Sequence, residues 1–299
     1  MLYIQFYRRM ANLKEIRSRI NSVGSTMQIT SAMKMVSAAK LKKAQDAITA
    51  MRPYADKLTE LLQNLSATLD ADSGSKFSEQ RQVNKVLIVA ITSNRGLAGA
   101  FNSNIVKEAK RTAASSFADK QVDYLTIGKK ANDILKKNQT VILNNNQIFD
   151  DLTFDAVSEV AELLMQKFED GEYDKIVLIY NKFKNAATQI VMNEQFLPIL
   201  PPKVDEAEAE KATPNYIFEP NKEDIVSELI PKSLKTQLFK AIRDSVASEH
   251  GARMTAMHKA TDNAKELRDD LKLQYNKARQ ASITNEILEI VGGAEALAG

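Results

Sequence analysis

The sequence predicts an α/β protein in which a Rossmann-like central body is inserted between long N- and C-terminal helices that form an antiparallel coiled coil. Two observations lead to this fold class. Apolar residues recur in an a/d pattern over roughly eight heptads of the N-terminal segment, and the middle of the chain alternates apolar runs with helical segments. We therefore expect a helix over 10–70, a body over 83–200, a linker over 201–221 and a second long helix over 222–299.

The N-terminal helix is predicted from two registers of the heptad pattern, in which only Lys34 is strongly out of type. Helices in globular domains average about 11–12 residues, so a helix this long needs another helix to cover its apolar stripe. Pro53 removes a hydrogen-bond donor inside it, and we expect a bend there. The two registers are Ile16, Val23, Thr30, Ser37, Ala44, Met51, Leu58, Leu65 and Ile20, Met27, Lys34, Leu41, Ile48, Ala55, Leu62, Leu69.

The partner helix is predicted at the other end of the chain. After Pro231, the last proline, Gly251 is the only glycine before Gly292, and the segment is rich in strong helix formers. An antiparallel pairing is the simplest way to bury both stripes. The apolar spacing of the second helix is looser, and it places these residues in the seam: Leu267, Leu271, Tyr275, Ala278, Ser282, Ile283, Ile287 and Ile290.

Between the helices the pattern changes to alternating strands and helices, which indicates a mostly parallel sheet. The run 198–220 holds five prolines and an acidic stretch, so we expect a loop or linker there. The predicted strands are 86–91, 122–127, 141–143, 175–180 and 189–196, and the predicted helices are 102–117, 129–137 and 155–168.

The charge is unevenly spread along the chain. Residues 1–66 carry eleven bases and four acids, a balance of +7, whereas 67–221 carry 18 bases and 22 acids and 222–299 carry twelve of each. The absence of cysteine excludes disulfides, thiolate nucleophiles and cysteine metal ligands. No apolar run reaches the roughly 18 residues that span a bilayer. The first nine residues lack the features of a secretory signal, and Met10 is the simpler start of the chain.

No group of residues assembles a convincing active site. Gly96 and Gly99 follow the first strand, but the three-glycine dinucleotide pattern and its acidic residue are missing, so a tight strand-to-helix turn is the favoured interpretation. His250 and His258 are eight residues apart, too far to share a metal unaided. The adjacent pair Asp269–Asp270 points in different directions on a helix. We expect a non-catalytic chain that holds no cofactor or metal.

Several ordered motifs resemble the gamma subunit of rotary proton-translocating (F-type) ATP synthases. At the front these are ANLKEIRSRI (11–20) and MQITSAMKMVSAAKLKKAQ (27–45), and in the middle NRGLAGAFN (94–102), YNKF (180–183) and YIFEP (216–220). At the end they are SEHGARMTAMHKATDNA (248–264), YNKARQAS (275–282) and the run from Ile283 to Ala296. The resemblance covers nearly everything from Met10 onward.

This resemblance implies a central rotor shaft that couples proton-driven rotation of a membrane ring to ATP synthesis or hydrolysis on partner subunits. The implied partners are the alternating alpha and beta subunits of the threefold catalytic head, the epsilon subunit and the rotor ring, with no nucleic acid. The implied location is peripheral, on the cytoplasmic face of a bacterial inner membrane. By similarity, Met33, Arg253, Arg279, Gln280, Thr284 and Glu286 match positions that contact the head, and Tyr216 and Glu219 match a foot that contacts the ring.

Two other functional classes remain open from the residues alone. The basic first helix could belong to a coiled-coil scaffold or a nucleic-acid-binding rod, whose binding would weaken steeply with salt. The central body could belong to a nucleotide-using enzyme, which a nucleotide titration would detect.

Overall fold

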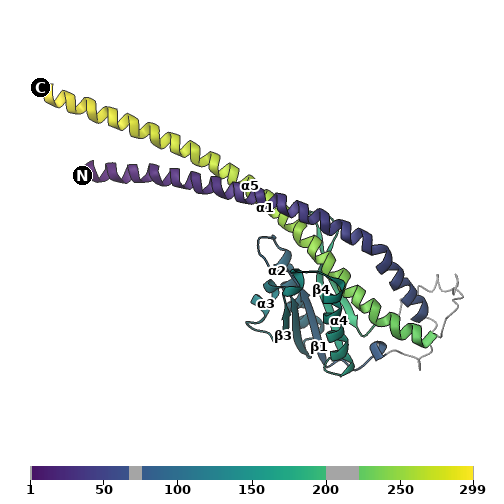
Figure 1. The fold of residues 1–299 in the computed structure, drawn as a ribbon. Coiled ribbons are helices and arrows are strands. Elements are labelled where there is room, and N and C mark those ends of the chain that lie inside the picture. The colour runs from purple at the N-terminus through teal and green to yellow at the C-terminus, as the bar shows by residue number, and fades with distance from the viewer. Residues whose placement is uncertain (1, 67–75, 200–221, 299) are drawn as a thin grey trace, which may run out of the picture. The chain divides into compact units, whose positions relative to one another are not determined.

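The computed structural model describes residues 2–66, 76–199 and 222–298, and these form two compact units. The paired-helix unit comprises Met1–Val36 and Met254–Gly299, and the body unit comprises Ser37–Arg253. Two long helices, α1 (Leu2–Ser66) and α5 (Lys222–Ala298), contribute residues to both units. Both are drawn as continuous ribbons in Figure 1, and the helices run unbroken through Pro53 and Pro231.

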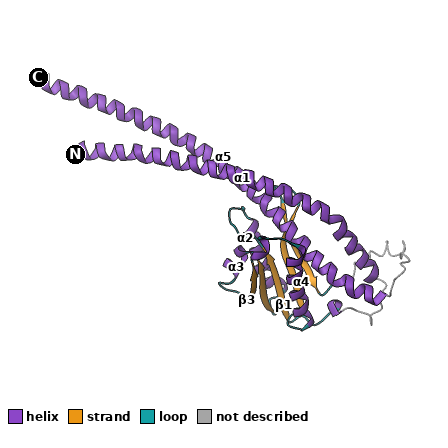
Figure 2. Ribbon diagram, viewed as in Figure 1, coloured by secondary structure: helices purple, strands orange, loops and turns teal. Residues whose placement is uncertain are grey.

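The body unit contains one five-stranded sheet with the strand order β3-β2-β1-β4-β5. Figure 2 draws its strands in orange. β1 pairs in parallel with β2 and β4, and β2 pairs in parallel with β3, whereas β5 is antiparallel to β4. The mostly parallel sheet is therefore confirmed. The strands are β1 (Lys85–Ile91), β2 (Gln121–Ile127), β3 (Val141–Asn145), β4 (Lys175–Phe183) and β5 (Gln189–Leu197).

Helices cover both faces of this sheet, because the crossover between parallel strands needs a helix. The remaining helices are α2 (Phe101–Ser116), α3 (Lys129–Leu135) and α4 (Phe154–Glu169), with short 3₁₀ turns η2 (Lys76–Ser78) and η3 (Gln147–Phe149). The bounds of α2, α3 and α4 agree with those of the predicted helices to within two residues. The linker 201–221 lies outside the described residues.

The body has two hydrophobic clusters, one on each face of the sheet. Alternate β1 residues point into opposite clusters, as the period of two in a strand requires: Val86, Ile88 and Ala90 on one side, and Leu87, Val89 and Ile91 on the other. The first group packs with α2 and α3, and the second packs with α4 and with α5 residues from Ile230 to Ile242. One stretch of α5 is therefore part of the core of the body.

Candidate functional site

The paired-helix unit is held by contacts that run in opposite directions along its two helices. Lys34 Nζ lies 3.4 Å from His258 Nδ1, and Thr261 Oγ1 lies 2.8 Å from Thr30 Oγ1. Further along, Arg268 Nη1 lies 3.8 Å from Met27 Sδ. Partner numbers rise on α5 as they fall on α1, so the antiparallel pairing of the terminal helices is confirmed.

The predicted stripe of α1 is the stripe that faces inward. In the paired-helix unit, Thr30 is buried and its apolar heptad neighbours are half-buried. In the body unit the described members of the two registers are buried or half-buried as well: Ser37, Leu41, Ala44, Ile48, Met51, Ala55 and Leu58. The side chains of Leu62, Leu65 and Leu69 lie outside the described residues. The out-of-type Lys34 is half-buried beside His258.

The predicted seam of α5 was partly wrong. Leu271 is buried, but Leu267, Ile283, Ile287 and Ile290 are between 47% and 71% exposed. The residues that turn inward follow a regular spacing of four and three residues, and several are polar. Four predicted residues are among them and are confirmed, namely Leu271, Tyr275, Ala278 and Ser282, whereas the apolar spacing leaves the inward face at Leu267 and after Ser282. They are Met257, Thr261, Ala264, Arg268, Leu271, Tyr275, Ala278, Ser282 and Asn285.

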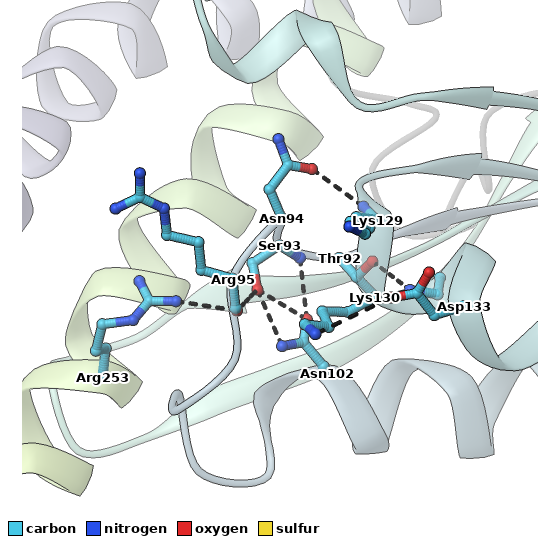
Figure 3. Close-up of polar contacts among 10 residues, drawn as sticks. Thr92, Ser93, Asn94, Arg95, Asn102, Lys129, Lys130, Asp133 and Arg253 are labelled. Carbon is cyan, nitrogen blue, oxygen red and sulfur yellow. Dashed lines mark hydrogen bonds and ion pairs between the residues drawn. The ribbon is translucent and has the colours of Figure 1, made fainter.

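The loop after β1, for which the sequence favours a tight strand-to-helix turn over a phosphate-binding loop, is closed by hydrogen bonds within the chain (Figure 3). The backbone N–H of Ser93 donates to Asn102 Oδ1 at 2.9 Å, and Ser93 Oγ donates to the carbonyl of Arg95 at 2.6 Å. Gly99 has a φ of +58°, which supports the interpretation of a tight turn. Leu97 adopts a φ of +62° at the exposed tip of the loop.

Arg253 joins this loop to α5 within the body unit (Figure 3). Its Nη2 donates to the carbonyls of Arg95 and Gly96, each at 3.2 Å, and its Nη1 lies 2.5 Å from Glu249 Oε1. The arginine side chain is 9% exposed and the glutamate side chain 13%. Both charges are thus paired and largely removed from water, a costly arrangement unless the geometry is maintained.

The two histidines have different surroundings. His250 is half-buried, and burial, with Arg253 and Lys40 nearby, lowers its pKa to about 4, so it is neutral at pH 7. His258 is exposed, with Asp262 Oδ2 3.4 Å from its Nδ1. Within the described ranges no three potential ligands gather into a metal site, and no helix is long and apolar enough to cross a membrane.

Asp244 is a buried carboxyl group of α5 that faces α1 in the body unit. It is 1% exposed, neither oxygen accepts a well-formed hydrogen bond from the described residues, and Arg52 Nη2 lies 3.8 Å from Oδ1. Burial raises the pKa of this carboxyl group above its usual value. The nearby cations Arg52, Lys240 and Lys182 and the backbone N–H of Phe183 offset the rise only in part.

Asp244→Asn should remove a pH-dependent part of the stability. A carboxyl group whose folded pKa is raised stabilises the fold fully below its unfolded pKa of about 3.9, and this contribution is lost as the pH rises through the folded pKa. Asparagine does not titrate, so the variant should gain stability relative to the parent as the solution approaches neutral pH. Thermal melts of the full chain between about pH 4 and pH 8 measure this. A constant difference across that range would contradict the prediction.

Comparison with known proteins finds relatives that match nearly the whole sequence. The ATP synthase family model matches residues 12–297. The ATP synthase gamma chain of Flavobacterium psychrophilum is 72% identical over 290 residues, which cover 97% of this chain and all of that relative. The chain belongs to the ATP synthase gamma chain family. The gamma chain of Cytophaga hutchinsonii is 52% identical, over 96% of this chain and 99% of its own length.

Solved structures agree with the gamma chain fold. A chain in the central stalk and c-ring structure of the Tetrahymena thermophila mitochondrial ATP synthase is 28% identical, with a TM-score of 0.58 over 78% of this chain and 99% of its own. A chain in the Euglena gracilis enzyme is 21% identical, with a TM-score of 0.67 over 96% of this chain and 95% of its own, and shows the fold alone. Members of the gamma chain family are non-catalytic subunits that form the central stalk of ATP synthase. They are peripheral subunits of the complex, and the curated relatives named above are bacterial.

The residues that the gamma chain resemblance assigns to the catalytic head differ in their exposure. Met33 is half-buried on α1, whereas α5 presents four side chains in the last part of the paired-helix unit: Arg279, Gln280, Thr284 and Glu286, all of them exposed. Arg253 is buried against the loop after β1, a role that sequence reasoning missed. Its contact with the head stays a prediction, as do the others. Tyr216 and Glu219, assigned to the rotor ring, lie outside the described residues.

Proposed function

We propose that this chain is the rotating shaft that couples proton-driven rotation of a membrane ring to ATP synthesis or hydrolysis at sites on partner subunits. The partners are the alternating alpha and beta subunits of a threefold head, an epsilon subunit and the ring. The chain would be held at the cytoplasmic face of a bacterial plasma membrane through that ring. Its membership of the gamma chain family supports this proposal.

The observation that carries the proposal is the exposed C-terminal stretch of α5. Ile283, Ile287, Leu288, Ile290 and Val291 are all about half exposed or more. Exposed apolar surface of this extent is typical of an interaction site. The side chains supply smooth steric contact and no nucleophile, which suits a shaft that turns inside an apolar sleeve.

A rod inside a threefold head must contact the three catalytic sites differently, because its own surface has no threefold symmetry. A ligand or partner biases conformational states only through contacts that differ between them. One turning rod therefore holds the three catalytic sites in different conformational states at any moment. The basic α1, with a balance of +7 over residues 1–66, would favour acidic loops on the surrounding subunits.

Truncation and glutamine substitution test this proposal in the assembled complex. Removing the residues after Leu288 should lower the rate of ATP hydrolysis only in part, because steric contact is lost in proportion to the length of helix removed. Glu286→Gln and Glu289→Gln should each leave hydrolysis nearly intact, because neither carboxylate takes part in the chemistry. The measurement is the rate of ATP hydrolysis by complexes that contain one copy of this chain per threefold head. Complete loss in a glutamine variant that still assembles would overturn the shaft proposal in favour of an enzyme.

A further inference from the structure

The body unit binds α5 as part of its own core. Buried α5 residues join the same hydrophobic cluster as β1, β4 and α4: Ile230, Leu234, Leu238, Ala241 and Ile242. Among the described residues, neither cluster of the body includes a residue of α1. In apolar packing, therefore, α5 belongs to the body, and α1 lies outside its core.

Polar contacts flank this apolar stripe on one side of α5. Gln237 Nε2 donates to Glu194 Oε1 on β5 at 2.6 Å. Ser248 Oγ, which is fully buried, donates to the carbonyl of Asn181 on β4 at 2.9 Å. At Gly251 the backbone approaches the β4–β5 turn so closely that a Cβ would lie 3.1 Å from the backbone of Ala186.

Side chains on the opposite side of α5 make a second row of contacts. Lys235 Nζ lies 2.5 Å from Glu162 Oε1 on α4, and Arg243 Nη2 donates to the carbonyl of Leu152 at 3.0 Å. Arg253 completes this row through the loop after β1. At about 100° per residue, Lys235, Arg243 and Arg253 fall on one side of the helix, and Gln237, Ser248 and Gly251 fall roughly half a turn away.

Two opposed rows resist turning of the helix about its own axis. Apolar packing is non-directional, so a stripe alone fixes the angle of a helix less closely than hydrogen bonds do. Hydrogen bonds weaken steeply with angle and distance, so bonds on both sides must break before α5 turns in either sense. The rows extend over residues 235–253, about 27 Å of helix. We call this stretch of α5 the anchor segment.

We propose that the anchor segment is where rotation of the body enters the shaft, so that α5 carries the torque and α1 follows through its seam with α5. This inference rests on the proposed function as a rotor. It makes Arg243 and Ser248 positioning residues, which touch no nucleotide and act by fixing the angle of α5 in the body.

Variants that remove contacts from one row or from both test the proposal. Gln237→Leu with Ser248→Ala removes three hydrogen bonds from one row, because Gln237 also donates to the carbonyl of Gln195, whereas Arg243→Met with Ser248→Ala removes one from each row. Met27→Ala on α1, where Sδ lies 3.8 Å from Arg268 Nη1, is a seam control in the paired-helix unit, outside the anchor segment. Each variant is assembled into the complete complex in vesicles, and ATP hydrolysis and ATP-driven proton pumping are measured together.

The variant with both rows weakened should hydrolyse ATP at the parent rate and pump fewer protons per ATP than the parent. The one-row variant and Met27→Ala should keep the pumping ratio of the parent. An equal fall in the one-row and two-row variants, or an equal fall in the seam control, would overturn the proposal.

A second two-row variant and the parent complex distinguish the possible outcomes. If Arg243→Met with Ser248→Ala does not assemble, Lys235→Met with Gln237→Leu again weakens both rows, by one contact and by two, and should also lower pumping. The parent chain serves as the reference for the rotor itself. A parent complex that hydrolyses ATP without pumping would contradict the proposed function, whereas normal pumping by the parent and by both two-row variants would contradict only the anchor segment.

Discussion

Replacing Leu58 with aspartate is expected to lower the free energy of unfolding of the full chain by about 3–5 kcal/mol. Leu58 is 6% exposed on the inward stripe of α1 in the body unit. The substitution removes buried apolar area and places a carboxylate where an apolar side chain is buried, and burial of a charge is costly. Circular dichroism melts of the full chain measure the loss.

The matched control is Ala50→Asp, which adds the same charge on the exposed side of α1. Its cost should stay below about 1 kcal/mol, the difference in helix propensity. Equal melting curves for Leu58→Asp and the parent would show that this stripe is not a buried seam. Leu62 belongs to the same predicted register, but its side chain lies outside the described residues, so Leu58 is the sharper test.

Gly128→Ala should destabilise the body by a similar amount, about 3–5 kcal/mol. Gly128 links β2 to α3 with a φ of +103°, and a Cβ built there would lie 2.2 Å from the carbonyl oxygen of Thr92. The clash is with backbone, so no side-chain rotation relieves it. The ends of β1 and β2 are already joined by the bond from Thr92 N–H to the carbonyl of Ile127 at 2.8 Å, which prevents the strands from separating.

Two other glycines serve as references for this prediction. Denaturant unfolding measures the free energy of unfolding of all three alanine variants. A Cβ added at Gly24 would meet no atom within 4 Å, so Gly24→Ala should stabilise α1 by up to about 1 kcal/mol. Gly251→Ala should fall between the two, because its contact with Ala186 is tight but not prohibitive. A ranking in which Gly128→Ala is the mildest of the three would contradict the geometry at the end of β2.

The sequence was a good guide to the fold wherever burial follows apolar composition. The strand over 86–91 is apolar throughout because both faces of the sheet are covered, and the stripe of α1 is marked by residues such as Leu41 and Ile48. The seam of α5 was harder, since Thr261 and Arg268 occupy inward positions while Leu267 is exposed. A search for the regular spacing from Met257, regardless of residue type, would have found it.

The role of Arg253 could not be read from the sequence for a different reason. Its guanidinium bonds to the carbonyls of Arg95 and Gly96, which lie 158 and 157 positions away in the chain, and every residue type carries a carbonyl. No side-chain pattern therefore marks the acceptors. The same holds for Ser248 and Asn181, whose pairing depends on the packing of α5 against β4. Contacts to backbone atoms become visible only when the tertiary fold is known.

The pairing of Thr30 with Thr261 also sets the order of events during synthesis. The two residues are 231 positions apart, so at 5–20 residues per second α1 waits roughly ten to fifty seconds on the ribosome before its partner is made. A stripe of large aliphatic residues left uncovered for that time would invite aggregation. One of the two inward registers is instead small or weakly polar in the middle of α1, namely Thr30, Ser37 and Ala44, while Leu41 and Ile48 lie in the other. The small register reduces the apolar surface that stays uncovered while the chain waits, and the helix pair closes as one of the last folding steps.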